Sequence, residues 1–141
     1  MILIPVAGWV TISFVLLALL NFLLKQVSRE YVKKLPGEYK EFADAYRRFM
    51  QRIIRTHRYF GAAALAFYML HAGMVVFLYK TVSVTGMVAG LILIATVFLG
   101  AYGFFVRKNL RSWWITAHRG GAFALLVSAL IHLFYKVYIS W

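Results

Sequence analysis

Cysteine is absent from the 141 residues of this sequence, and acidic side chains are scarce. Without cysteine the chain cannot form disulfides, cysteine-ligated zinc sites, iron–sulfur clusters or a covalent c-type haem attachment. Any metal must therefore be held by histidine, methionine or oxygen ligands. The four acids all lie outside the long apolar runs, which argues against a hydrolase built on paired carboxylates and against a proton pump with its own buried carboxylate relay. These acids are Glu30, Glu38, Glu41 and Asp44.

Hydrophobic residues are abundant where charge is missing. They make up 63% of the chain, and only 14% of the residues are charged. Ordinary soluble domains are nearer half apolar and a quarter charged, so a chain of this size could not bury so much apolar surface in water. The composition predicts an all-α integral membrane protein with a single domain over residues 1–141.

Four apolar runs are long enough to cross a bilayer as helices. A polar, basic stretch separates the first two runs, and within it residues 38–54 place apolar side chains at helical spacing. This stretch predicts an amphipathic helix lying in the membrane interface, between the first two spans of a four-helix bundle. The first run is expected to be a retained helix rather than a signal peptide, because its positive charge, Lys25, follows it. The predicted spans are 2–24, 57–79, 86–106 and 113–138.

The positive charges predict the orientation of these spans. Of the 16 Lys and Arg residues, 14 lie in residues 25–58 and 107–119, which fall on one side of a four-span arrangement, and two lie on the other. The positive-inside rule makes these basic segments cytoplasmic and both termini external, as in a prokaryotic cytoplasmic membrane. The net charge of +12 is thereby explained by membrane topology, and no nucleic-acid partner is expected.

The four histidines of the chain form two matched pairs. His57 and His71 are 14 residues apart in the second span, and His118 and His132 are 14 residues apart in the fourth. Fourteen residues are close to four helical turns, so both members of a pair share one helix face, about 21 Å apart along the axis. Since the two spans run parallel, the pairs create two levels, and each level offers two imidazoles.

Two donors at each of two distant levels favour haem over other metal centres. Zinc and divalent copper need three or four converging ligands, whereas a haem iron takes four nitrogens from the porphyrin and two from the protein. Small residues between the histidines could leave room for flat macrocycles, although ordinary helix packing explains them equally well. These residues are Gly61, Ala64, Gly121, Ala122, Ser128 and Ala129. Four glycines of the third span, Gly86, Gly90, Gly100 and Gly103, predict close helix packing.

The histidine pairs, the arginine after each first histidine and the four-span frame resemble di-haem b-type membrane cytochromes. The likeness is to the ferric-reductase-like transmembrane domain and to the four-helix haem core of cytochrome b, and it covers residues 55–136. It implies two non-covalent haem b groups, one ligated by His57 and His118 on the cytoplasmic side and the other by His71 and His132 on the outer side. It also implies transmembrane electron transfer, with quinone as a further cofactor to consider.

Four further side chains are candidates for supporting roles. Each ligand imidazole should donate its second N–H to a carbonyl or hydroxyl oxygen, and Ser128, one turn before His132, is a candidate acceptor. Arg55, Arg58 and Arg119 lie beside the cytoplasmic-side histidines and could pair with haem propionates, or with lipid phosphates.

Electron transfer is the leading functional hypothesis, and two alternatives stay open. As a conduit, the chain would serve as a subunit or partner in a redox chain, such as a quinol or metal reductase, alone or in a homo- or hetero-oligomer. A non-redox anchor or assembly subunit would use the histidines for helix packing. A transition-metal or proton pathway would use them as relay sites, but the absence of acids and cysteines within the spans counts against it.

Overall fold

A computed structural model describes residues 2–107 and 112–139 of the chain, and these residues are almost entirely helical. Four helices account for most of them: α1 (Leu3–Glu30), α2 (Lys40–Tyr79), α3 (Val84–Tyr102) and α4 (Trp113–Phe134). Short 3-10 turns, η1 (Val32–Lys34) and η2 (Gly37–Tyr39), join α1 to α2. Two π-helical turns, η3 (Gly103–Arg107) and η4 (Tyr135–Ile139), extend α3 and α4.

The helix ends have local causes. The α1–α2 turn contains Pro36, which cannot continue a helix because it lacks a backbone N–H. Helix α2 ends at Tyr79, and the next residue, Lys80, adopts a left-handed conformation with φ of 52°. Helix α3 then begins after Ser83, whose hydroxyl accepts a hydrogen bond from the backbone N–H of Gly86.

All four expected spans are present as helices that are long and apolar enough to cross a membrane. The expected helix at 38–54 is also present, but it is not a separate element. It forms the first part of α2, which runs unbroken for 40 residues, or about 60 Å. The expectation of a helix separate from the second span was therefore wrong, whereas its place at a membrane interface stays a prediction.

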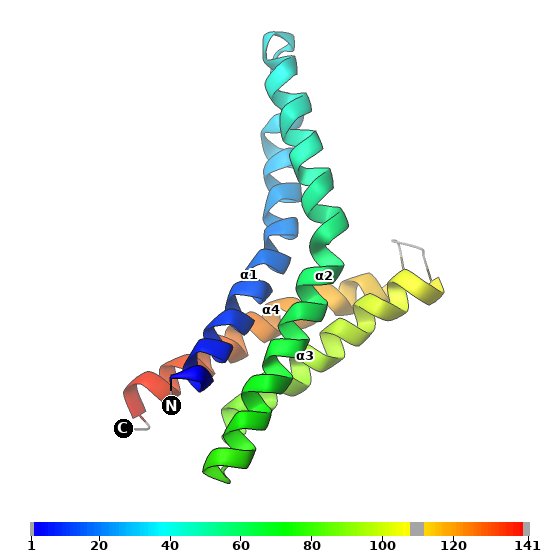
Figure 1. Cartoon of the computed structure of the whole chain (residues 1–141). Helices are drawn as coiled ribbons and strands as arrows, with labels where there is room; N and C mark the ends of the chain where they lie inside the picture. The colour runs from blue at the N-terminus through cyan, green and yellow to red at the C-terminus, as the bar shows by residue number, and fades with distance from the viewer. Residues whose placement is uncertain (1, 108–111, 140–141) are drawn as a thin grey trace.

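Packing against α1 explains why the amphipathic part of α2 continues the helix. Helices α1 and α2 run side by side beyond the apolar region and form the long projection at the top of Figure 1. The hydroxyl of Tyr46 donates a 2.8 Å hydrogen bond to the carbonyl of Leu24, and Ser28, Val32 and Ala43 are buried here. The apolar stripe predicted to face lipid therefore contributes at least part of its surface to a helical hairpin.

The four helices meet in one small core. It contains one buried residue from each helix: Val15, Ala64, Leu93 and Leu125. Ala64 and Leu125 each lie seven residues from both histidines of their own helix, so this core separates the two histidine levels. Ala64 is 1% exposed, which identifies it as a helix-packing residue rather than part of an open haem cradle.

Glycines of α3 and η3 allow close approach, as the sequence predicted. The Tyr68 ring lies against Gly90, and the Trp114 ring lies against Gly103, in space that any Cβ would occupy. Close contact through glycine is typical of helices packed inside membranes.

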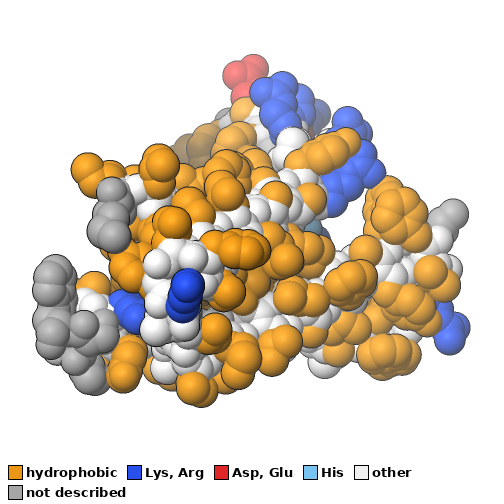
Figure 2. Space-filling view, turned by 60° about the horizontal axis from the view of Figure 1, so that its bottom comes forward, with side chains coloured by type: hydrophobic (Ala, Val, Ile, Leu, Met, Phe, Trp, Pro, Cys, Tyr) orange, Lys and Arg blue, Asp and Glu red, His pale blue; other side chains and the backbone are white. Residues whose placement is uncertain are grey.

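Large apolar side chains cover the outside of the helices. Phe77, Leu91, Phe98 and Val127 are each more than half exposed, and hydrophobic side chains dominate the face shown in Figure 2. Monomeric soluble proteins rarely expose apolar patches larger than a few hundred Å². The exposed apolar surface is thus consistent with four helices that are long and apolar enough to cross a membrane.

Candidate functional site: two histidine levels

The fold brings the first histidine of α2 beside the first histidine of α4. The ring centroids of His57 and His118 are 6.0 Å apart, and the ring planes are nearly perpendicular, at 87°. At the other level His71 and His132 are near enough for electrostatic interaction between their rings. The two pairs expected from the sequence are therefore the pairs that the structure brings together.

Each histidine is tied through Nδ1 to an oxygen atom of a neighbouring helix. The distances are 3.0 Å from His57 to the Ala18 carbonyl and 2.9 Å from His71 to the Ile4 carbonyl. A carbonyl oxygen can only accept, so Nδ1 carries the proton and donates it in both cases. The lone pair of each neutral ring then resides on Nε2, which is the form that can bind a metal.

The second helical hairpin repeats this arrangement with one difference. His118 Nδ1 donates to the Thr96 carbonyl at 2.9 Å, again leaving the lone pair on Nε2. His132 Nδ1 instead lies 2.9 Å from the Thr85 side-chain hydroxyl. A hydroxyl can donate or accept, so the proton position on His132 depends on what else Thr85 contacts.

Helix α1 provides both oxygen acceptors for α2 at a matching spacing. Ile4 and Ala18 are 14 residues apart, as are His57 and His71, so the two antiparallel helices remain in register at both levels. Helix α3 provides both partners for α4. Each hairpin, α1–α2 and α3–α4, is thus a unit that orients two imidazoles.

Glycines give three of the four rings access to these oxygens. A Cβ added at Gly8, one turn after Ile4, would lie 3.2 Å from Cε1 of His71. The corresponding distances are 3.1 Å from Gly100 to His118 and 2.9 Å from Gly86 to His132. Gly86 and Gly100, which were predicted only for helix packing, therefore also lie against histidine rings, as does Gly8.

Two of the expected supporting residues have other contacts. The Ser128 hydroxyl donates to the Leu125 carbonyl of its own helix at 3.0 Å, and His132 Nδ1 pairs with Thr85 instead, so the prediction that Ser128 accepts from His132 was wrong. The guanidinium of Arg58 donates to the Tyr59 hydroxyl at 2.7 Å and lies over the rings of Tyr59 and Phe104. Arg55 is exposed.

Arg119 belongs to a basic cluster that the sequence analysis missed. With Lys25 and Arg29 it lines a small cavity beside the first histidine level, together with Phe22 and Gln26. Lys25 is close enough to interact electrostatically with Arg119, Arg29 and His57. Within residues 2–107 and 112–139 the ion pairs join Lys34 to Glu30 and Arg47 to Asp44, so neither neutralises this cluster.

Two buried polar atoms near the same level lack a protein partner in the described part of the chain. They are Oδ1 of Asn21, one turn after Ala18, and Oγ1 of Thr96, which lies against Gly121. Buried polar atoms in proteins normally have a partner, so the region around His57 and His118 has unused hydrogen-bonding capacity. By contrast, no heavy atom lies within 4 Å of a Cβ added at Gly61, which leaves open space one turn after His57.

The partners missed by the sequence analysis fall into two classes. Carbonyls of Ile4, Ala18 and Thr96 have no side-chain signature, so no sequence pattern identifies them. Lys25 and Thr85 do have informative side chains, but only their position relative to the histidines gives them a role.

The donor sets restrict what the site can hold. No cluster of three or more His, Asp or Glu side chains suited to a metal ion occurs among the described residues. Each level instead offers two imidazoles. The tautomer is fixed by a backbone carbonyl in three of the four histidines and depends on the Thr85 hydroxyl in His132. Comparisons with protein-family models, curated proteins and solved structures gave no match, so the geometry of the two histidine levels is the basis for assigning a function.

Proposed function

We propose that this protein transfers electrons across a membrane through two haem b groups, each held by two histidines. His57 and His118 would hold one haem, and His71 and His132 the other. The observation that carries the proposal is the geometry of the first pair. Two imidazoles that bind one metal from opposite sides at about 2 Å have ring centroids about 6 Å apart. The observed separation of His57 and His118 is 6.0 Å.

The hydrogen bonds at Nδ1 support the same assignment. Histidine ligands commonly donate their second N–H to a carbonyl or other acceptor, which orients the ring and raises the basicity of the ligating nitrogen. Three of the four histidines here have a backbone carbonyl in that position. Zinc fits less well, because each level offers two protein ligands where zinc sites use three or four.

Haem b supplies one-electron iron chemistry when bound, and the protein determines how far apart the two haem groups would lie. The two levels are separated by 14 residues, or about 21 Å along α2. Such a spacing places one site toward each face of a bilayer whose hydrocarbon core is about 30 Å thick. The cluster of Lys25, Arg29 and Arg119 suits the anionic propionates of the first haem better than Arg55 or Arg58 does.

Orientation in the membrane follows from the charge distribution. The basic segments at 25–58 and 107–119 would be cytoplasmic, and both termini would be external, as expected in a prokaryotic cytoplasmic membrane. The first haem would then be on the cytoplasmic side and the second on the outer side. The chain would exchange electrons with a quinol or with redox partner proteins, as a subunit of a quinol or metal reductase system.

A reduced-minus-oxidised spectrum of the purified protein, combined with haem quantification, tests the proposal. Two haems per chain with b-type Soret and α bands are expected. His57→Ala and His118→Ala should each remove the same haem, and His71→Ala and His132→Ala the other, as judged by potentiometric titration. Absence of b-type bands refutes the assignment. Loss of the same haem from His57→Ala and His132→Ala would refute the pairing.

A structural role for the histidines is the alternative that has an observation in its favour. The same four hydrogen bonds join α2 to α1 and α4 to α3, as they would in a non-redox anchor or assembly subunit. In that case the wild-type protein purifies without iron, and substitution of any histidine lowers thermal stability alone. A transition-metal pathway would instead give stoichiometric zinc or copper without iron.

A further inference from the structure

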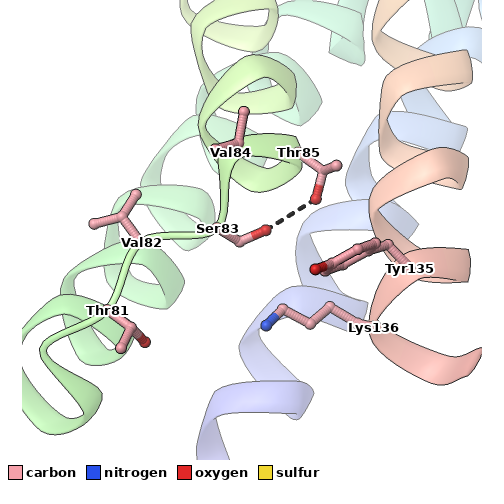
Figure 3. A pocket seen from close by; sticks show the side chains of 7 residues that line it. All are labelled: Thr81, Val82, Ser83, Val84, Thr85, Tyr135 and Lys136. Atoms are coloured by element: carbon pink, nitrogen blue, oxygen red, sulfur yellow. Dashed lines mark hydrogen bonds between the residues drawn. The ribbon is translucent and has the colours of Figure 1, made fainter. Parts of the chain in front are cut away.

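A cavity of about 380 Å³, lined by hydroxyl-bearing side chains, two valines and Lys136, opens near His132, at the end of the molecule remote from the basic cluster. The connection between α2 and α3 and the first two residues of α3, together residues 81–85, form one wall, and Tyr135 and Lys136 of η4 form the other. In Figure 3 the Tyr135 hydroxyl and the Lys136 ammonium extend toward that connection. The volume lies within the usual range for small-molecule sites.

The lining is suited to an anion with several oxygen atoms. Four hydroxyl groups, from Thr81, Ser83, Thr85 and Tyr135, can donate hydrogen bonds, and the charged lining residue, Lys136, is positive. All four carboxylate side chains of the protein lie between residues 30 and 44, near the opposite end.

A short chain of hydroxyls connects the cavity to the histidine. The Ser83 and Thr85 side-chain oxygens are 2.9 Å apart, and Thr85 Oγ1 is 2.9 Å from His132 Nδ1. Ser83 also accepts from the Gly86 N–H. Each hydroxyl has a single proton to donate. The group to which Ser83 donates therefore decides which partner is the donor in the Ser83–Thr85 and Thr85–His132 hydrogen bonds.

An anion in the cavity would set that direction. When Ser83 donates to the anion, Thr85 can donate to Ser83, and His132 then donates from Nδ1 to Thr85. This direction leaves the lone pair on Nε2 of His132. In the other three histidines a backbone carbonyl enforces the same state permanently.

We propose that this cavity binds a small organic anion through carboxylate or phosphate oxygens, and that its occupancy is transmitted through Ser83 and Thr85 to His132. The binding itself does not depend on haem. The transmission rests on the proposed function, since it acts on the haem held by His71 and His132. An anion that strengthens donation from His132 raises the basicity of the ligand, so it should lower the redox potential of that haem.

Isothermal titration calorimetry with citrate tests the binding, using full-length protein in nanodiscs of neutral phosphatidylcholine. Saturable binding of citrate is expected, without binding of the uncharged polyol xylitol. Lys136→Gln should weaken citrate binding at least about tenfold, as expected for loss of one charge-assisted contact. Lys80→Gln is the matched control, because Lys80 lies one residue before Thr81 but outside the lining. No binding to wild-type protein, or equal binding to Lys136→Gln, overturns the proposal.

Two further measurements locate the source of the anion and the coupling. The first measurement repeats the citrate titration in nanodiscs that contain phosphatidylglycerol. If this anionic lipid blocks citrate binding, the occupant is a lipid phosphate; if citrate binding is unchanged, the occupant is a soluble carboxylate. In redox titrations citrate should lower the potential of one haem only, and Ser83→Ala should abolish the shift. Citrate binding without any potential shift in a di-haem protein refutes the transmission. Citrate binding to protein that contains no haem refutes the proposed function and leaves the anion site intact.

Discussion

The glycines beneath the histidine rings allow a sharp test of the haem assignment. In Gly86→Ala the added methyl would lie 2.9 Å from Cε1 of His132, whereas ordinary contacts begin at 3.4 Å. The ring must therefore retreat by about half an ångström, which exceeds the roughly 0.2 Å tolerance of a metal–ligand bond. In Gly100→Ala the corresponding contact to His118 is 3.1 Å, so a smaller displacement is required.

The two substitutions should act on different haems and to different extents. Gly86→Ala is expected to weaken the haem held by His71 and His132 about tenfold, equivalent to roughly 1.4 kcal/mol. Gly100→Ala should weaken the other haem by a smaller factor. Alanine favours a helix over glycine by about 1 kcal/mol, so neither change should destabilise its own helix.

Haem titration of the apoprotein, followed at the Soret band and by potentiometry, measures both effects. Gly73→Ala is the control, because no heavy atom lies within 4 Å of its added methyl although His71 is two residues away. Full occupancy and unshifted potentials in Gly86→Ala would show that His132 does not ligate from its observed position. Equal damage from Gly73→Ala would refute the contact argument as a whole.

Three further substitutions test separate contacts. Thr85→Val removes the hydroxyl that pairs with His132 Nδ1, so it should weaken one haem about 10–100-fold and raise its potential in redox titrations, while the other haem is unchanged. Tyr46→Phe removes the hydrogen bond to the Leu24 carbonyl and should lower the free energy of unfolding by about 1 kcal/mol in thermal denaturation. Burial raises the pKa of the Tyr46 hydroxyl above its ordinary value of 10.0, so the wild type should lose stability as the pH rises beyond that value, and Tyr46→Phe should lose less. Thr96→Val replaces a buried hydroxyl that lacks a partner among the described residues, and unfolding of the apoprotein should show a neutral or stabilising effect. A loss above about 1 kcal/mol would show that this hydroxyl has a partner.

The sequence predicted the elements that depend on local pattern. Apolar runs identified four helices, and the 14-residue spacing predicted that two histidines share one face of each of two helices. Charge counting predicted that the second and fourth helices run parallel, which led to the pairing of His57 with His118. The structure brings these two rings together.

Local pattern was insufficient where packing decides the outcome. Residues 38–54 have the amphipathic character of an interfacial helix, but the same apolar stripe can pack on a neighbouring helix. In the structure Tyr46 bonds to the extended end of α1 and Ala43 is buried, whereas Phe42 and Phe49 stay exposed, and α2 is a single helix. Arg58 directly follows His57, which suggested a contact with a haem propionate. In the structure its guanidinium lies over the rings of Tyr59 and Phe104.

By itself the sequence determined the helices, the placement of the histidines on them and the two levels, because these depend on helix periodicity and on the cost of burying charge in hydrocarbon. Only the tertiary structure decided how each imidazole is oriented. Backbone carbonyls of α1 and α3 accept from three rings, and every residue carries such a carbonyl, so no residue type indicates which one is used. The exception is His132, whose partner is the Thr85 hydroxyl, and the chain of hydroxyls from His132 to the cavity exists only because α3 begins beside the end of α4.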